Sequence, residues 1–139
     1  MFVAANIFGI GIATVIPAEN LAEVLDLYIP ILDLRIVSLA ALFLGCGFIG
    51  LHPVVVVLTL GAILSPETMG LRDWVLGLVF LGCWGLTTMV SPYSGTTLIM
   101  SRFTGIASHV IGWRWAPLSV LFNAALMIAF IIALRHATL

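Results

Sequence analysis

The chain has 139 residues, of which 63% are hydrophobic and only 8% carry a charge, whereas soluble domains average about 25% charged residues. So few charges cannot cover a water-soluble surface, and the composition therefore predicts a protein embedded in a lipid bilayer. The net charge is −1 and lysine is absent, which excludes the basic surface that nucleic acid would bind.

Four stretches free of charged residues are long enough to cross or deeply enter a bilayer. They cover residues 1–18, 36–66, 74–101 and 115–134. Each matches or exceeds the roughly 18 apolar residues that indicate a spanning helix. The expected fold is an all-α membrane protein, a multi-pass helical bundle in the cell (inner) membrane, with the lipid bilayer as its first partner.

The first stretch predicts a transmembrane helix over residues 1–17. A signal peptide is the alternative, but no Lys or Arg precedes the apolar part, and Pro17, Glu19 and Asn20 stand where a cleavage site would be. The abrupt start at Met1 is typical of a chain that forms the C-terminal part of a longer protein.

Residues 18–35 predict an interfacial segment. Glu19, Glu23 and Asp26 are spaced so that they share one helical face, and Pro30 ends the helix. We interpret this acidic face as exposed to water at the membrane surface. The alternative, which is less favoured, is that it forms an acidic binding site.

The second stretch, residues 36–66, predicts a re-entrant helical hairpin. One straight helix over its 31 residues would measure about 46 Å, against about 30 Å of hydrocarbon. Proline removes a backbone donor and disfavours helix in the residue before it. The His52-Pro53 pair therefore divides the stretch into two halves of similar length, with the tip near residues 50–54.

The third stretch predicts a discontinuous transmembrane helix over residues 74–111, broken at residues 91–97. Its first half ends where polar turn residues stand at a depth that lipid would otherwise occupy. These residues are Ser91, Pro92, Tyr93, Ser94, Gly95, Thr96 and Thr97. The second half is expected to run from Leu98 to about Ile111.

Residues 115–134 predict the last transmembrane helix, with Trp113 and Trp115 at one interface and Arg135 at the other. Only Asn123 interrupts this apolar stretch. An interhelical hydrogen bond from Asn123 is favoured over ligand binding.

Residues 91–97 are the first candidate binding site. Irregular backbone at membrane depth is tolerated only inside protein or beside a watery cavity, and transporters place such breaks where ions and solutes bind. A half-helix starting near Thr96 would point free N–H groups at the break and favour an anion, whereas exposed carbonyls would favour Na⁺. The alternative is a proline kink whose hydroxyls only satisfy freed backbone groups.

His52 and Pro53, at the hairpin tip, are the second candidate site. An imidazole titrates near neutrality and could carry a proton or bind a solute, so H⁺ is an alternative to Na⁺ as the coupling ion. A neutral histidine that caps the tip is the structural alternative. Arg102 either attracts an anion or extends its side chain to the membrane surface.

Enzyme chemistry has no support in the sequence. Gly45-Cys46-Gly47-Phe48-Ile49-Gly50 fits the dinucleotide fingerprint, but it lacks the strand and the acid of a βαβ unit, and close helix packing explains the small residues better. C-x-x-C, H-E-x-x-H and P-loop motifs are absent from the sequence. Neither a catalytic residue nor a resident metal or cofactor is therefore expected.

The order of these parts resembles the C-terminal half of carriers in the ion transporter superfamily, such as the divalent anion:sodium symporters. The resemblance covers about residues 36–134 and rests on layout more than on letters. In those carriers, a Ser-Asn-Thr motif at the hairpin tip and a Thr/Pro/Asn-rich motif in the broken helix line Na⁺ and carboxylate sites. The matching positions here are residues 50–53 and 91–97, and neither contains the family's Asn.

The resemblance implies secondary active transport of a small, carboxylate-type anion coupled to Na⁺ or H⁺. Such carriers use two inverted repeats, each with one hairpin and one broken helix, and this chain contains one set. A missing N-terminal half, a second subunit or a homo-oligomer is therefore an expected partner. The alternative function is a small multi-pass accessory or assembly subunit without a transport path of its own.

Overall fold

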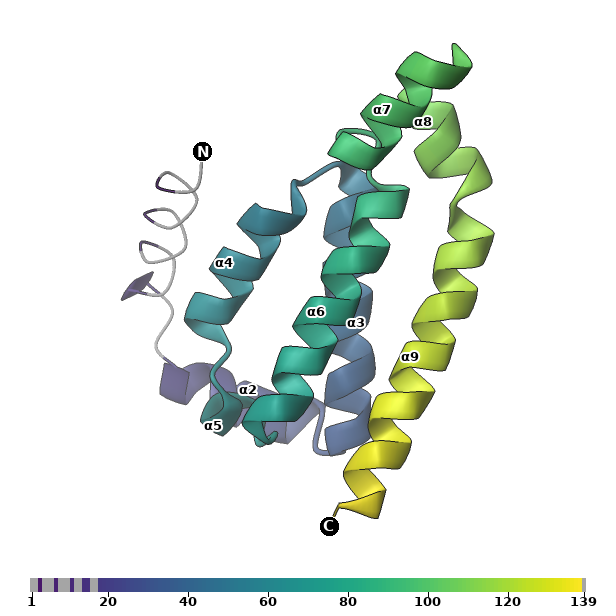
Figure 1. Ribbon diagram of the computed structural model, residues 1–139. Coiled ribbons are helices and arrows are strands. Elements are labelled where there is room, and N and C mark those ends of the chain that lie inside the picture. Colours follow the sequence, from purple (N-terminus) through teal and green to yellow (C-terminus); the bar gives the residue numbers. More distant parts are fainter. Residues whose placement is uncertain (1–2, 4–6, 8–10, 12–13, 16–17, 139) are drawn as a thin grey trace.

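The computed structural model describes residues 3, 7, 11, 14, 15 and 18–138 of the chain. The predicted span over residues 1–17 therefore lies outside the described residues at all but those five positions. Within the described part the chain is helical and contains no strand (Figure 1). The elements are α2 (Ala18–Tyr28), α3 (Leu32–Ile49), α4 (Pro53–Ile63), α5 (Pro66–Met69), α6 (Asp73–Val90), α7 (Gly95–Thr104), α8 (Ser108–Val110), the π-helical turn η1 (Ile111–Trp115) and α9 (Pro117–Ala137).

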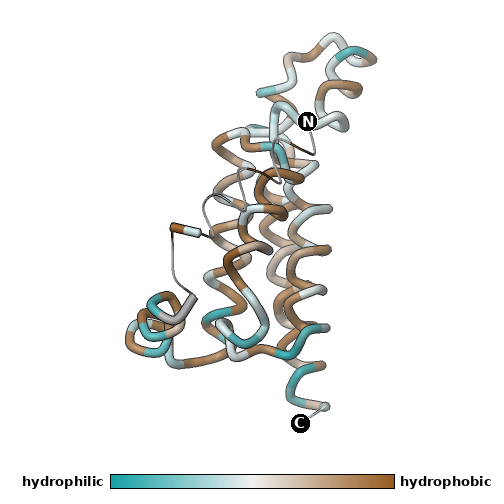
Figure 2. The backbone as a smooth tube through the Cα atoms, turned by 90° about the vertical axis from the view of Figure 1, so that its left-hand side faces the viewer, coloured by the Kyte–Doolittle hydropathy of each residue, from teal (hydrophilic) through white to brown (hydrophobic). Residues whose placement is uncertain are grey.

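Three helical segments of the described part are long and apolar enough to cross a membrane. They are α3, the pair α6 and α7 taken together, and α9. The 18 residues of α3 correspond to about 27 Å and so match a hydrocarbon core of about 30 Å. Figure 2 shows hydrophobic residues along the length of the helices and hydrophilic residues concentrated towards the helix ends.

The main core lies where α3, α6 and α9 pack together, with α4 covering another side of α6 (Figure 1). Ile36, Phe43, Val75, Val79 and Ile131 are almost completely buried there. These residues recur at helical spacing on the facing sides of their helices, so each helix buries one stripe and leaves the rest of its apolar surface outside. Burial of this stripe positions the end of α6 beside the end of α3.

Helices α3 and α4 are unequal, although similar halves were expected. Helix α3 has 18 residues and α4 has 11. The first helix is longer because it starts at Leu32, so residues 32–35, predicted to be interfacial, belong to α3. A charged residue is tolerated inside this apolar helix because each of the three guanidinium nitrogens of Arg35 donates a hydrogen bond.

Arg35 is the centre of what we call the charged end of the bundle, formed by Asp26, Asp33, Arg35, Arg72, Arg135 and His136. Only 4% of Arg35 is exposed, and its side chain donates to the Ile29 carbonyl (2.8 Å), to the Met69 carbonyl (3.0 Å) and to the Asp26 carboxylate. One side chain thus ties α2 and α5 to the start of α3. Figure 1 shows α2, α5 and the C-terminus at this same end.

Helices α3 and α9 are joined at the charged end by ion pairs. Arg135 donates to Asp33 at 2.5 Å, and His136 lies 3.0 Å from the other carboxylate oxygen. Arg72 donates to the Thr138 carbonyl at 2.9 Å. Charged groups of the loops and of the C-terminal helix therefore meet on one side of the bundle.

The chain leaves helical geometry near the middle of the second apolar stretch and again within the third. At the first, Gly50 adopts the left-handed conformation (φ 97°), and its N–H caps α3, after which Pro53 opens α4. At the second, α6 ends at Val90 and α7 begins at Gly95. The non-helical residues are therefore 50–52 and 91–94, and residues 95–97 form the first turn of α7.

Two predicted boundaries and one predicted contact are wrong. Helix α7 ends at Thr104 instead of near Ile111, because Gly105 takes a left-handed conformation and caps it. The last helix begins at Pro117 and reaches Ala137. Asn123 makes no interhelical bond in the described part; its side chain is exposed and donates to the Ser119 carbonyl of its own helix at 2.7 Å.

Candidate functional site

The α3–α4 turn and the α6–α7 break lie together at the end of the bundle opposite the charged end (Figure 1). A Cβ atom on Gly50 would lie 2.6 Å from the ring of Tyr93, so glycine is required here both for its conformation and for space. Trp113 of η1 donates its indole N–H to the Phe48 carbonyl at 2.9 Å. We call this region, formed by residues 47–52, 87–97 and 111–116, the break end.

Gly112 lets η1 contact the backbone of the break directly. A Cβ atom at this position would lie 2.6 Å from the Val90 carbonyl oxygen and 3.2 Å from the Pro92 nitrogen. Gly47 of α3 similarly accommodates the Thr87 side chain, which a Cβ would overlap. Glycine therefore allows close packing at the break, against backbone at Gly112 and against a side chain at Gly47.

Two hydroxyls within residues 91–97 satisfy backbone groups that the break frees. Ser94 donates to the Thr88 carbonyl at 2.5 Å and accepts from the Thr97 N–H at 3.2 Å, so it is the N-cap of α7. Thr97 donates to the Ser91 carbonyl at 2.7 Å. For Ser94 and Thr97, the structural role that was kept as an alternative accounts for the hydrogen bonds.

Two other hydroxyls at the break end have no partner. Thr87 and Ser91 have no exposed surface, and neither Thr87 Oγ1 nor Ser91 Oγ makes a hydrogen bond with any described residue. They are four residues apart and so lie on the same side of the last turn of α6. Unpaired buried hydroxyls are costly and uncommon.

Sequence reasoning missed Thr87, because it lies inside the apolar helix and outside the polar stretch that follows. Its position four residues before Ser91 was the signal that could have identified it. Other residues of the stretch 91–97 lie at the surface: Tyr93, Gly95 and Thr96 are exposed. Pro92 is fully buried beside Ser91.

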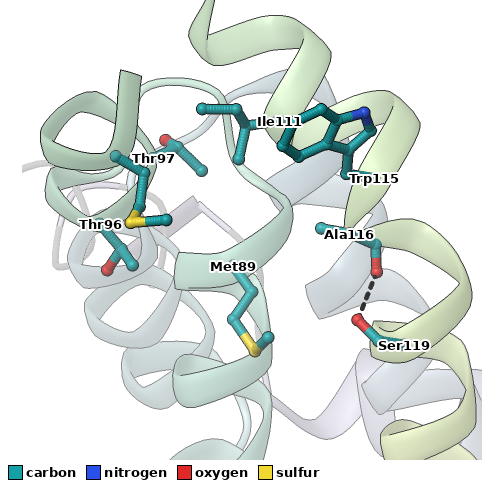
Figure 3. A pocket seen from close by; sticks show the side chains of 8 residues that line it. Met89, Thr96, Thr97, Ile111, Trp115, Ala116 and Ser119 are labelled. Atoms are coloured by element: carbon teal, nitrogen blue, oxygen red, sulfur yellow. Dashed lines mark hydrogen bonds between the residues drawn. The ribbon is translucent and has the colours of Figure 1, made fainter. Parts of the chain in front are cut away.

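Figure 3 shows a cavity beside the break, with a volume of about 230 Å³. Thr96 and Thr97 of α7 lie on one side of it, and Trp115 and Ser119 lie on another. The complete lining is Met89, Thr96, Thr97, Met100, Ile111, Trp115, Ala116 and Ser119. The start of α7 therefore opens onto this cavity, since Thr96 and Thr97 belong to its first turn.

His52 and Pro53 are part of the α3–α4 turn. His52 is the N-cap of α4: its Nδ1 accepts from the Val54 N–H at 3.3 Å. Pro53 is fully buried at the first position of that helix. Neither lines the cavity of Figure 3, so the structure joins the turn to the break through Gly50 and Tyr93 and not through His52.

The polar groups at the break end are hydroxyls, backbone amides and carbonyls, together with the His52 imidazole, the Arg114 guanidinium and the indole N–H groups of Trp113 and Trp115. Among the described residues, no group of three or more His, Cys, Asp and Glu side chains gathers in one place. Thr87 and Ser91 offer oxygen ligands beside the carbonyl end of α6, and the first turn of α7 offers N–H groups.

No family of known proteins, no curated protein and no solved structure matches this chain.

Proposed function

We propose that this chain is part of a secondary active transporter that moves a small, carboxylate-type anion across a membrane together with Na⁺ or H⁺. The observation that carries the proposal is the break between α6 and α7, which opens two oppositely polarised helix ends within one apolar stretch. Discontinuous helices of this kind bind ions and solutes in transporters. The proposed action is binding and release during a conformational change, without covalent chemistry.

The first turn of α7 is the proposed anion site. Of its amides, the Thr97 N–H is taken by Ser94 Oγ and the Leu98 N–H by the Ser94 carbonyl. The Gly95 and Thr96 N–H groups bond to no described residue. Both belong to the positive end of the helix dipole, which favours a carboxylate.

The last turn of α6 is the proposed site of a coupling cation. Its end carries the negative side of the helix dipole, and the unpartnered hydroxyls of Thr87 and Ser91 lie in the same turn. Na⁺ is bound in transporters by just such carbonyl ends and oxygen ligands. This assignment takes Na⁺ as the coupling ion, because the groups of this turn are oxygen ligands.

The proposal includes the placement of α3 and α4 as a re-entrant hairpin. The 11 residues of α4 measure about 16 Å, about half of the hydrocarbon thickness. A helix of that length does not cross the bilayer, whereas α3 is long enough to do so. A second set of hairpin and broken helix, from a missing half, another subunit or a second copy, would complete the transport path.

The direct test is solute uptake into proteoliposomes that contain the chain. Replacement of Thr96, which is exposed at the cavity, by valine is expected to lower anion uptake at least about tenfold, through loss of one hydroxyl contact to the solute. Thr104→Val, at the far end of the same helix, is the matched control. Equal uptake by wild type and Thr96→Val would contradict the placement of the anion at α7.

The cation site has its own test. Thr87→Val is expected to weaken the Na⁺ dependence of uptake, whereas Thr88→Val is not, because Thr88 donates to the Gly85 carbonyl on a different side of α6. An unchanged half-saturating Na⁺ concentration in Thr87→Val would remove this pair from the coupling site.

A second candidate function, an accessory or assembly subunit without a transport path, is favoured by one observation. Ser94 and Thr97 satisfy backbone groups of the break itself, so these hydroxyls have a purely structural use. This function predicts that Thr96→Val and Thr87→Val leave the activity of a co-purified partner unchanged. Loss of solute uptake in either variant would exclude it.

A further inference from the structure

We infer that the surface formed by α7, α8 and η1 (residues 95–115) binds the phosphate headgroups of anionic lipids in the leaflet that it faces. We call it the headgroup surface, and it lies at the end of the bundle opposite the charged end (Figure 1). The inference does not depend on the proposed transport function, because it rests on two arginines, Arg102 and Arg114, that take no part in the proposed anion and cation sites.

Helix α9 sets the depth of this surface in a membrane. Its 21 residues, Pro117–Ala137, measure about 31 Å and match a hydrocarbon core of about 30 Å. Arg135 stands at one end of that length, and Trp113, Arg114 and Trp115 precede the other end. Both tryptophans are exposed, as is typical of the aromatic belt at a membrane surface. When α9 spans the bilayer, η1 therefore lies at the level of the lipid headgroups.

The two ends of the bundle differ in the sign of their charge. All six acidic residues of the chain lie between Glu19 and Asp73, and the elements that carry them, α2, α5 and the starts of α3 and α6, meet at the charged end (Figure 1). The sequence contains no acid after Asp73, so the headgroup surface carries Arg102 and Arg114 without an acidic residue to balance them. An anion is therefore attracted to this end of the molecule.

The five arginines of the chain are used differently at the two ends. Arg35, Arg72 and Arg135 each donate to a carbonyl or a carboxylate. Arg102 and Arg114 are exposed, and neither guanidinium makes an ion pair or a hydrogen bond with a described residue. Their donors are available for phosphate oxygens, which a guanidinium binds in a two-pronged arrangement.

Exposed apolar side chains share the headgroup surface with these arginines. Leu98, Ile99 and Phe103 of α7 are exposed, and 85% of Phe103 is accessible. Such side chains are unfavourable in water but are buried by the acyl chains just below the headgroups. Arg102, in the same helix, can keep its methylene groups among those chains and extend its guanidinium to the phosphate. Cations beside exposed apolar groups thus match a phospholipid better than a soluble anion.

The test compares phosphatidylglycerol with phosphatidylcholine, which differ in headgroup charge and can carry the same acyl chains, brominated near the carbonyl end. Bromine quenches nearby tryptophans, and replacement of Trp74 and Trp84 by phenylalanine leaves only Trp113 and Trp115, both at the headgroup surface. In mixed vesicles, this full-length two-tryptophan chain is expected to prefer phosphatidylglycerol at least about fivefold, the factor that one arginine near a charged surface contributes. The preference should fall towards unity in about 1 M salt, where charges are screened beyond about 3 Å.

Variants of the two-tryptophan chain assign the preference to the two arginines. Arg102→Gln together with Arg114→Gln is expected to reduce it to less than about twofold. Arg102→Lys together with Arg114→Lys should retain most of it, because an ammonium also binds phosphate, as a point charge. Arg72→Gln is the matched control, since it removes the same charge from the opposite end and should leave the preference unchanged.

Three results would overturn the inference. Equal quenching by the two lipids in the two-tryptophan chain would exclude anionic headgroups and leave an acidic protein surface as the counterpart of the arginines. An undiminished preference in the double glutamine variant, or an equal loss in Arg72→Gln, would remove the assignment to Arg102 and Arg114. Loss of the preference on addition of millimolar glycerol phosphate at constant ionic strength would identify a soluble phosphate as the ligand. None of these measurements involves solute uptake, so each failure leaves the transport proposal standing.

Discussion

The two ends of the bundle are built on different principles. At the charged end, the Arg35 guanidinium donates hydrogen bonds to two carbonyls and a carboxylate. The Asp33 carboxylate contacts both Arg135 and His136. At the break end, segments meet through glycine, and Thr87 and Ser91 keep hydroxyls that bond to nothing in the described part. One end is thus held mainly by side-chain hydrogen bonds, with the buried Nε of Arg135 left without a partner, whereas the other is closely packed and leaves two buried hydroxyls without a partner in the described part.

This difference separates stability from function. Paired polar groups make an end rigid, whereas unpaired buried groups cost stability. Substitutions at the charged end should therefore affect folding alone. Substitutions at the break end should fall into two classes, those that disturb the packing and those that affect only binding.

The largest expected effect is that of Gly112→Ala. The new Cβ would lie 2.6 Å from the Val90 carbonyl oxygen, and backbone cannot rotate away as a side chain can. We expect a loss of about 3 kcal/mol or more in the free energy of unfolding, measured by thermal or SDS-induced unfolding in detergent. Gly85→Ala, where a Cβ meets nothing within 4 Å, is the control and should change stability by no more than about 1 kcal/mol. Equal stability of the two variants would contradict the backbone contact.

The next largest effect is expected at the other end, from Arg35→Met. This change keeps most of the buried volume but leaves the Ile29 and Met69 carbonyls without their donor. A loss of about 2–4 kcal/mol is expected, with earlier proteolysis between α2 and α3. Arg102→Met is the control, because Arg102 is exposed. If Arg35→Met were as stable as the wild type, the hydrogen bonds of Arg35 would not be what stabilises the charged end, and the contrast between the two ends would be lost.

Gly50→Ala should have a smaller effect of about 1–2 kcal/mol, because alanine is strained at φ 97°. Part of that loss comes from the contact with the Tyr93 ring. The double variant with Tyr93→Ala should therefore lose less than the sum of the two single variants. Strict additivity in unfolding experiments would mean that the turn and the break are not in contact.

The smallest effect on stability is expected from Thr87→Val. Valine keeps the shape and removes a hydroxyl without a partner, so stability should change by less than about 1 kcal/mol, in the stabilising direction. Thr97→Val, which removes the bond to the Ser91 carbonyl, should cost about 1–2 kcal/mol. Melting temperatures of the two variants check this ranking, and a destabilised Thr87→Val would reveal a structural partner for that hydroxyl.

Local chemistry in the sequence was enough to locate both interruptions. Proline and glycine act on neighbouring backbone, so Gly50, Pro53 and Pro92 indicated where helices stop without any knowledge of tertiary contacts. The apolar stretches likewise predicted two of the three described segments that are long enough to span a membrane, α6 with α7 and α9, whereas α3, the third, was expected to be a shorter half of the hairpin.

The remaining features depend on contacts between segments that are distant in the sequence. Arg35 reads as the end of a surface segment until its partners at Ile29 and Met69 are known, and this explains why the start of α3 was misplaced. Gly112 resembles any loop glycine until it is seen against Val90. Thr87 reads as one more residue of an apolar helix, because its lack of a partner is a property of the folded molecule only.

Helix α9 is held along a narrow strip: only 17% of its spanning segment is buried, compared with 39% for α3. The outward-facing side of the helix carries Leu118, Phe122, Leu126 and Phe130. Surrounding hydrocarbon requires these side chains to be apolar but does not require a particular shape. Evolutionary drift on that outer face should consequently exchange leucine, isoleucine, valine and phenylalanine freely, while Val120, Ala124 and Ile131, on the inner strip, tolerate far fewer replacements.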